Sequence, residues 1–355
     1  MKKRIVYLDI LKVLACTMVV LLHCNTSAWS STNPDSIRFL TQNLFSTITR
    51  PCVNLFVMVT GALILSSGKK LSVLECVKRS VNFLTLVVLW SAFYMLMNNY
   101  RAILSGEFNF FDGIKQALLN PESHLWYLIM LAGLYLLMPF IQVIIKDAGN
   151  TLYLIALFVF FDVFKQLFVN ALNIDAFNFY YENINISLSY VGYLVLGYYL
   201  STNNFSKKQT GTIYLLGVLS VIGIYAVTQI TSVKNGVITT TLYSYFSLPT
   251  FLYSAALFVF VKNIGIHLPD NNHKILTALS NYSFGIYLVH IASLRVITKF
   301  CFAITDFPAI LSIPAMFISV SSTSLLIVYV INKIPILNLI FSTSIFKKLK
   351  LYKRT

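Results

Sequence analysis

Apolar runs of about 20 residues, separated by short polar segments, recur along almost the whole sequence. This is the length at which an α-helix crosses the hydrocarbon core of a bilayer. Hydrophobic residues make up 57% of the 355 positions and charged residues 11%, whereas a soluble domain carries about 25% charged residues. We find no ten-residue segments of alternating polarity, which are typical of membrane strands. The sequence therefore predicts an all-α polytopic integral membrane protein.

We count ten spans within a single domain over residues 1–355. The expected spans are residues 5–28, 45–66, 81–99, 125–145, 151–169, 186–203, 211–230, 245–262, 281–299 and 309–331. Most of the 27 Lys and Arg residues fall in loops that alternate along the chain, as orientation by positive charge produces. Both termini are therefore expected in the cytoplasm. The net charge of +15 needs no nucleic-acid partner to explain it.

Two connecting segments are expected to form helices of their own. Residues 101–123 form an outer loop whose apolar face predicts a helix lying in the interface. Residues 263–280 predict a cytoplasmic amphipathic segment.

The first span carries an acid, a base and a histidine, namely Asp9, Lys12 and His23. Lys12 and His23 are eleven residues apart, which on an α-helix is about 16 Å and places them on one face. Charges inside a membrane segment are costly and normally face a protein interior or a wet cavity. One interpretation is a buried Asp9–Lys12 pair with a hydrogen-bonded histidine, and the other is a functional site. The span alone leaves both open.

Other polar groups lie inside the expected spans or at their ends. Arg50-Pro51 opens the second span, and Asn54 follows one turn later. Trp126 and Tyr127, beside His124, are also typical of an interfacial aromatic belt. Ser283, Tyr287 and His290 share one helical face, where a satisfied core histidine is the alternative to a functional one.

Four stretches in order carry a resemblance: K-x10-H, R-P-x-x-N-L-F-x-x-x-T-G, H-L-W-Y-L and S-x-x-x-Y-L-x-H. Together they resemble the acyltransferase-3 family of membrane acyltransferases, over essentially the whole chain. The chain departs from the family pattern at Thr60-Gly61, where Ser-Gly is usual, and at Lys12, where Arg is commoner. The resemblance implies transfer of an acyl group, usually acetyl, from cytoplasmic acyl-CoA to a sugar hydroxyl across the membrane.

The resemblance and the residue types together assign candidate roles. His23 is the expected catalytic residue, either as a general base or as the acceptor of the acyl group. The remaining candidates are Arg50, Asn54, His124, Trp126 and Tyr127 for the oxyanion or acceptor, Lys12, Asp9, Lys69, Lys70, Lys78 and Arg79 for CoA, and Ser283, Tyr287 and His290 as a second polar cluster.

We expect acetyl-CoA as the donor substrate, with no permanently bound cofactor and no metal. The expected partners are a cell-surface glycan or its lipid-linked precursor and membrane lipids, and the expected location is the cell (inner or plasma) membrane. The alternative is a multi-span transporter or exporter, because sparse intramembrane charges also suit a proton-coupled carrier. We find no inverted repeat and no matching pair of broken spans, which such carriers commonly have. A membrane domain that only recruits partners leaves the buried charges unexplained.

Overall fold

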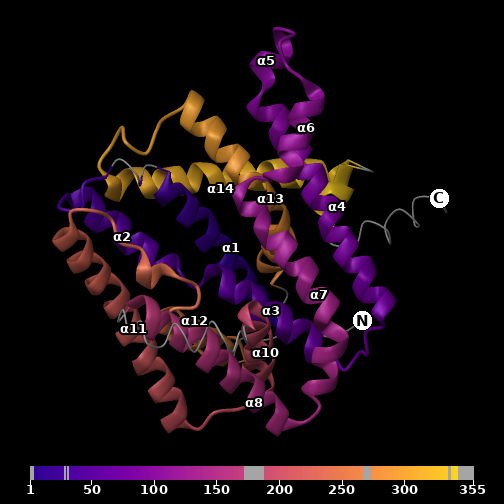
Figure 1. Ribbon diagram of the computed structural model, residues 1–355, viewed down its shortest axis with the longest axis vertical. Coiled ribbons are helices and arrows are strands. Elements are labelled where there is room, and N and C mark those ends of the chain that lie inside the picture. The colour runs from indigo at the N-terminus through magenta and orange to yellow at the C-terminus, as the bar shows by residue number, and fades with distance from the viewer. Residues whose placement is uncertain are drawn as a thin grey trace. The chain divides into compact units, whose positions relative to one another are not determined.

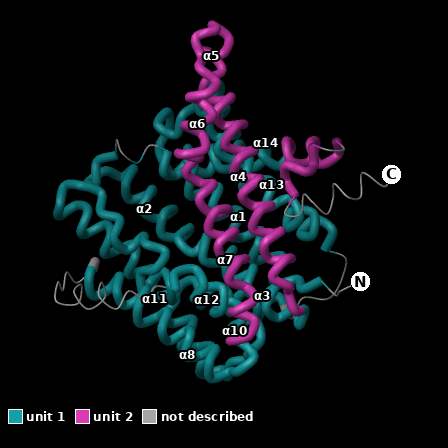
Figure 2. Tube along the Cα trace, turned by 45° about the vertical axis from the view of Figure 1, so that its right-hand side comes forward, with its two compact units in different colours: residues 1–69, 145–325 teal, residues 70–144, 326–355 magenta. Residues whose placement is uncertain are grey.

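The computed structural model describes residues 4–27, 29, 32–171, 188–266, 273–334 and 337–342. Every regular element in these residues is helical, which confirms the all-α prediction. The chain divides into two compact units, drawn in two colours in Figure 2. Unit 1 comprises residues 1–69 and 145–325, and unit 2 comprises residues 70–144 and 326–355.

Most helices belong to unit 1 (Figure 1). They are α1 (Val6–Thr26), α2 (Ile37–Thr49), α3 (Cys52–Leu65), α8 (Ala148–Phe158), η3 (Val159–Val163), η4 (Gln166–Ala171), α10 (Ser189–Thr202), α11 (Lys207–Asn235), η5 (Thr241–Tyr243), α12 (Leu248–Ile266), α13 (Lys274–Phe300) and most of α14 (Ala309–Lys333). Among them α1 is central, because it packs against α2, α3, α12 and α13.

Unit 2 is built on α4 (Val73–Asn98). This helix packs along α7 (Trp126–Ile144) and also contacts α5 (Tyr100–Leu104) and α6 (Phe110–Leu119). The 3-10 helices η2 (Ser123–Leu125) and η6 (Leu337–Phe341) and the last residues of α14 complete the unit. The helix expected within 101–123 is therefore present as α6, although its position relative to a bilayer stays a prediction.

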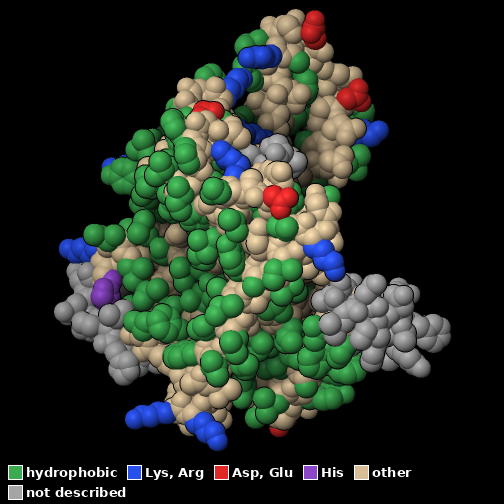
Figure 3. All heavy atoms as spheres, turned by 90° about the vertical axis from the view of Figure 1, so that its left-hand side faces the viewer, with side chains coloured by type: hydrophobic (Ala, Val, Ile, Leu, Met, Phe, Trp, Pro, Cys, Tyr) green, Lys and Arg blue, Asp and Glu red, His purple; other side chains and the backbone are tan. Residues whose placement is uncertain are grey.

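Nine helical segments in the described residues are long and apolar enough to cross a membrane. Exposed hydrophobic side chains cover much of the face drawn in Figure 3, as a lipid-facing surface requires. The prediction of ten spans differs at 186–203, where the described helix α10 has 14 residues and is largely buried inside unit 1. Residues 172–187 and 267–272 lie outside the described residues, so the expected segment 263–280 is described only as the end of α12 and the start of α13.

The second span begins earlier than predicted. Helical structure starts at Ile37 rather than at about residue 45, and it is interrupted at Arg50-Pro51 between α2 and α3. Pro51 lacks an N–H and suits the start of a helix, so the break falls there. The part of α2 that the prediction left out carries two buried polar residues, Gln42 and Asn43.

Charged side chains stabilise both ends of the buried helix α10. The Asp162 carboxylate accepts hydrogen bonds from the backbone N–H groups of Leu188 (2.8 Å) and Ser189 (3.1 Å). Lys262 Nζ donates to the carbonyl oxygens of Leu200 (2.9 Å) and Asn203 (2.6 Å). Each charge has the sign that the helix dipole favours at that end. Lys262 is not among the candidates named from the sequence.

Two glycines allow α3 and α10 to touch backbone to backbone. A Cβ atom on Gly61 would lie 1.9 Å from the carbonyl oxygen of Leu194, and one on Gly197 would lie 2.1 Å from that of Met58. Small residues at such crossings are typical of helix packing in membranes. This explains the need for glycine in the Thr60-Gly61 motif.

We therefore expect Gly61→Ala to destabilise the protein by on the order of 2–3 kcal/mol, the upper part of the range for overpacking. Thermal unfolding of the purified protein in detergent would measure the loss. Gly133→Ala is the matched control, because no atom lies within 4 Å of its added Cβ, and it should unfold at or slightly above the parent's temperature, since alanine favours the helix. Equal unfolding temperatures for the two variants would contradict the close contact of α3 and α10.

Candidate functional site

The helix α1 carries the residues singled out in the first span. It runs without a break from Val6 to Thr26, so Lys12 and His23 lie on one face about 16 Å apart along the axis, as predicted. Both side chains are half-buried. Within the described residues, neither the Lys12 amine nor the His23 imidazole makes a hydrogen bond. One helix therefore presents an amine and an imidazole that make no hydrogen bond to the described part of the chain.

Unit 1 places α13 directly beside α1. The Ser280 hydroxyl donates to Asp9 Oδ1 at 2.6 Å, and seven residues further along α1 the Cys16 thiol donates to the Ser283 carbonyl oxygen at 3.4 Å. Residue numbers increase together on the two helices, so α1 and α13 run in the same direction. This places Ser283 of the second polar cluster against the Lys12–His23 helix.

The next contact along the same seam joins two histidines. The imidazole rings of His23 and His290 have centroids 5.0 Å apart and planes inclined by 49°. His290 Nδ1 lies 2.6 Å from the Tyr287 carbonyl oxygen. A carbonyl oxygen only accepts, so Nδ1 carries the proton and Nε2 carries the lone pair. The structure thus joins the expected catalytic histidine to the second polar cluster.

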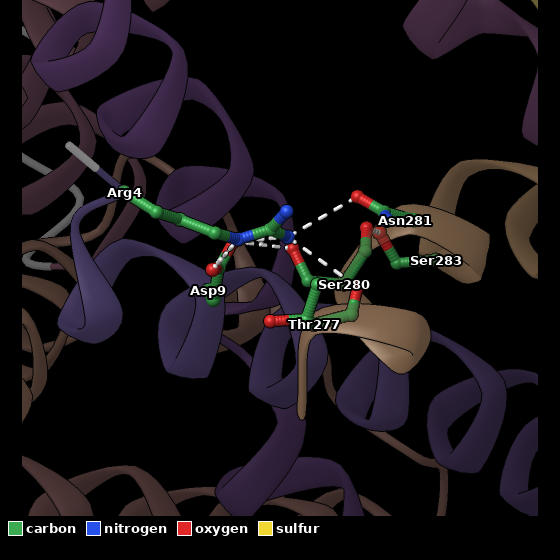
Figure 4. A network of polar contacts seen from close by, with 6 residues as sticks. All are labelled: Arg4, Asp9, Thr277, Ser280, Asn281 and Ser283. Atoms are coloured by element: carbon green, nitrogen blue, oxygen red, sulfur yellow. Dashed lines mark hydrogen bonds and ion pairs between the residues drawn. The ribbon is translucent and has the colours of Figure 1, made fainter. Parts of the chain in front are cut away.

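Arg4 closes the opposite end of this seam (Figure 4). Its Nε atom donates to Asp9 Oδ2, and its Nη2 atom donates to Asp9 Oδ1 at 3.1 Å. The same Nη2 atom also reaches the Thr277 carbonyl oxygen (3.3 Å) and Asn281 Oδ1 (3.1 Å) of α13. Together with the Ser280 hydroxyl, these donors surround the buried Asp9 carboxylate and fasten α1 to α13.

The Asp9–Lys12 pair that the sequence offered as an alternative is therefore corrected. The ion pair of Asp9 in the described residues is with Arg4, five residues earlier and just before α1 begins. The sequence missed Arg4 because positive charge before a first span is already explained by membrane orientation.

A small cavity lies beside α1 at the depth between Lys12 and His23. Its volume is about 180 Å³. The described lining residues are Val13, Cys16, Thr17 and Val20 of α1, Leu279, Ser283 and Ile286 of α13, and Phe317, Ser321, Ser322 and Leu325 of α14. It is largely apolar and follows α1 for about two turns.

A larger cavity of about 880 Å³ begins one turn beyond His23, at Thr26. The other described lining residues are Trp29, Ser46, Arg50, Gln166, Val169, Thr240, Thr241, Tyr243, Ser244, Tyr245 and Phe246. They provide hydroxyl, amide and aromatic groups and one cation. Residues 240–246 lie mostly between two predicted spans, 211–230 and 245–262, so their place in the wall is a product of the fold.

Arg50 is held in the wall of this cavity by two carbonyl oxygens and a ring. Its Nε atom donates to the Ser46 carbonyl at 2.9 Å, and its Nη1 atom donates to the Tyr243 carbonyl at 3.4 Å. The guanidinium carbon lies 4.6 Å from the centroid of the Tyr243 ring, which is within cation–π range. The side chain is thereby fixed in one orientation.

Asn54 lies behind the cavity rather than in its wall. It is fully buried, and its Nδ2 atom donates to the Tyr245 carbonyl oxygen (3.1 Å) and to Ser254 Oγ (3.1 Å). The Tyr193 hydroxyl donates to the same Tyr245 carbonyl at 2.5 Å. Both amide hydrogens of Asn54 are thus engaged within the fold. The arrangement favours a positioning role through Tyr245 over direct donation to an oxyanion.

A family model described as an acyltransferase domain matches residues 5–333. The chain belongs to the acyltransferase-3 family. No curated protein and no solved structure matches it. The chain is therefore a multi-pass membrane acyltransferase, as the four sequence motifs implied.

The third acyltransferase motif, H-L-W-Y-L, lies in unit 2. His124 is buried (3% exposed), and its ring meets that of Tyr94 at 5.2 Å. Tyr127 is also buried, whereas Trp126 is 37% exposed, as an interfacial belt residue would be. His124 and Tyr127 therefore face the interior of unit 2, while Arg50 and Asn54 belong to unit 1.

The basic residues expected to bind CoA fall into two groups. Lys69, Lys70 and Lys78 are exposed, as positive-inside placement alone would leave them. Arg79 is half-buried, and its Nη1 atom donates to the Tyr135 hydroxyl at 3.3 Å across α4 and α7. Within the described residues, no group of three or more His, Cys, Asp or Glu side chains could hold a metal ion.

The Arg4–Asp9 pair should be measurable as a coupling energy. Charge-assisted hydrogen bonds contribute about 1.5–3 kcal/mol, and we expect about 1 kcal/mol here because the Arg4 side chain is 43% exposed and solvent screens it. A double-mutant cycle of Arg4→Gln and Asp9→Asn, read by thermal unfolding in detergent, would give this value. Asp9→Asn combined with Lys234→Gln, an exposed lysine at the end of α11, should be additive. Additivity in the Arg4–Asp9 cycle would show that the pair contributes nothing.

Proposed function

We propose that this acyltransferase is an O-acetyltransferase that moves the acetyl group of acetyl-CoA to a sugar hydroxyl of a cell-surface glycan or its lipid-linked precursor. One observation carries the proposal. Lys12 and His23 lie on one face of an unbroken helix, with a narrow cavity beside the helix between them and a wide polar cavity beyond His23. This arrangement matches the length and chemistry of a CoA thioester that meets a sugar.

Lys12 is the group proposed to hold the phosphate end of the donor. A half-buried amine that makes no hydrogen bond within the described residues favours an anionic ligand, because a charge at that depth is costly without one. The flexible pantetheine arm would then follow the cavity beside Val13, Cys16 and Val20. Asp9, although bonded to Arg4, keeps α1 in place for this. Lys69, Lys70, Lys78 and Arg79 remain further candidates for the phosphates.

The wide cavity is proposed to bind the acceptor. Trp29, Tyr243 and Phe246 offer aromatic faces, and Thr26, Ser46 and Ser244 offer hydroxyl groups. A sugar needs both kinds of partner. A volume of about 880 Å³ lies within the usual range of small-molecule sites. The cavity begins one helical turn from His23, so a sugar bound in it would have its accepting hydroxyl near the imidazole.

His23 is the proposed catalytic residue. In one route its neutral imidazole takes the proton of the sugar hydroxyl as the oxygen attacks the thioester carbonyl carbon. The C–S bond then breaks, and the imidazolium returns the proton to the departing CoA thiolate. An unperturbed histidine has a pKa of about 6.5, so the neutral form is available near pH 7. The His290 ring against His23 restricts the orientation of the imidazole.

In the second route His23 itself takes the acetyl group. The imidazole nitrogen attacks the thioester carbonyl carbon, and the C–S bond breaks to release the CoA thiolate. The sugar oxygen then attacks the acyl-imidazole, the C–N bond breaks to restore the His23 imidazole, and the hydroxyl proton goes to the CoA thiolate. Arg50 could stabilise the developing oxyanion or hold the acceptor. Asn54 would act through Tyr245, and His124, Trp126 and Tyr127 remain candidates for acceptor contacts from unit 2.

His23→Gln should abolish transfer while acetyl-CoA binding and thermal stability remain near the parent's, because glutamine cannot accept a proton near pH 7. Acetyl transfer to a glycan acceptor and acetyl-CoA binding would both be measured on the purified protein. His273→Gln, the same change at the start of α13, is the matched control and should keep full transfer. Turnover of His23→Gln near the parent's rate would refute the assignment and favour the carrier alternative.

The two routes separate on protein given radiolabelled acetyl-CoA without an acceptor. Label retained on the parent but not on His23→Gln supports the acyl-imidazole. If neither the parent nor His23→Gln retains label, and the parent still transfers acetyl when acceptor is added, the result supports the general base.

Lys12→Ala should weaken acetyl-CoA binding by about 30-fold or more, because loss of a buried charge contact costs on the order of 2–5 kcal/mol. Lys12→Arg should be the mildest change, since it keeps a cation at the same depth. Calorimetric titration of the purified variants would measure both. Unchanged affinity in Lys12→Ala would remove Lys12 from the donor site.

Comparison of surface glycans from cells with and without this chain, by mass spectrometry, tests the overall reaction. A loss of one acetyl mass per repeating unit supports the proposal and identifies the acceptor. Identical glycans from both strains would count against it.

A further inference from the structure

We infer that the acceptor carries a negatively charged oxyanion group, a carboxylate or a phosphate, and that Arg50 binds it in the wide cavity. This rests on the proposal that the cavity holds the acceptor. Among the described lining residues Arg50 is the one charged group, and none of them is acidic. No ion pair joins Arg50 to a described residue. Within the part of the chain that the structure describes, this half-buried cation therefore has no counter-charge, and an anionic ligand would supply one.

The hydrogen bonds of Arg50 leave part of the guanidinium available. A guanidinium has five N–H donors. Two of them go to the carbonyl oxygens of Ser46 and Tyr243 through Nε and Nη1, and Nη2 makes no hydrogen bond to the described residues. The remaining donors are those that a carboxylate or phosphate accepts as a bidentate pair.

A second arginine, Arg38 near the start of α2, shows the contrast with Arg50, which follows the end of that helix. Both Nη atoms of Arg38 donate to carbonyl oxygens that precede α14, those of Ile304 (3.1 Å), Thr305 (3.4 Å) and Phe307 (3.0 Å). Arg38 thus serves the fold. Arg50 is held by fewer bonds and is oriented over the Tyr243 ring, which fixes the guanidinium plane. This preorganisation lowers the cost of binding an anion.

The other lining residues of the wide cavity indicate what kind of molecule carries the negative charge. The hydroxyl groups of Thr26, Thr240 and Thr241 and the ring of Trp29 suit the hydroxyls and the ring face of a sugar. The ligand class is therefore an acidic sugar. Its charge comes from a carboxylate on the sugar ring, as in a uronic acid, or from a phosphate on it, as in a sugar phosphate or a lipid-linked precursor. Both present the same oxyanion geometry to Arg50.

The test uses the purified full-length protein and three small probes: methyl β-D-glucuronide, methyl β-D-glucoside and glucose 1-phosphate. The first two differ in whether C6 bears a carboxylate or a hydroxyl, and the third carries phosphate. The parent should bind at least one charged probe about 10–100-fold more tightly than the glucoside, the range for charge-assisted hydrogen bonds. Which charged probe binds better distinguishes a carboxylate acceptor from a phosphate acceptor.

Arg50→Gln should bring affinity for the charged probe down to that for the glucoside and leave glucoside binding unchanged. Arg50→Lys should keep part of the preference, because it restores the charge without the bidentate fork. Lys234→Gln removes a positive charge from an exposed position at the end of α11 and should change nothing. Acetyl-CoA binding at the parent's level would show that each variant is folded.

The inference is overturned if the parent binds all three probes equally, if neither charged probe binds, or if Arg50→Gln keeps the preference. These outcomes are separate from failure of the proposed function. A preference for the charged probes without any acetyl transfer would leave the anion site in place and refute the transfer reaction. Acetyl transfer to a neutral acceptor, with no preference for the charged probes, would support the transfer reaction and refute the anion site.

Discussion

The buried carboxylate of Asp9 sets the constraint around which unit 1 is organised. A charge on a membrane helix is costly unless protein surrounds and neutralises it, and here Arg4 and the Ser280 hydroxyl do so. These contacts fasten α1 to α13 at one end and fix the register of the two helices. The same register brings His23 against His290 at the other end. A structural ion pair and a candidate catalytic pair are thus two ends of one seam.

The helix α10 shows the same constraint applied to backbone groups. A short buried helix leaves unpaired N–H and C=O groups at its ends, and no water is available in a membrane to bind them. Asp162 and Lys262 supply the missing partners. Gly61 and Gly197 let α10 approach α3 closely. Some of the few charges inside unit 1 therefore hold helices together. Others, such as Lys12 and Arg50, make no hydrogen bond to a carboxylate in the described residues.

The charges that the described part of the fold does not pair are the ones that the proposed reaction uses. Transfer across a membrane needs a donor and an acceptor to meet at one point from opposite ends. The proposed donor and acceptor sites follow one another along α1 and the residues after it. Their order is Lys12, the narrow cavity, His23 and the wide cavity. Arg50 lies in the wall of the wide cavity and has N–H donors that the described part of the fold does not use, so selection of the acceptor and the acetyl transfer step would use different residues.

The sequence by itself determined the helical class, most of the spans, the shared face of Lys12 and His23, and the four motifs of the acyltransferase-3 family. These follow from apolar length and helical period, which are local properties of the chain. Only the tertiary structure decided that Asp9 pairs with Arg4, that His290 meets His23, and that residues 240–246 line a cavity with Arg50. The last two join segments separated by about 200 residues or more, and the first depends on α13 lying against Arg4. Such contacts depend on which helices pack together, and neither hydropathy nor periodicity encodes that choice.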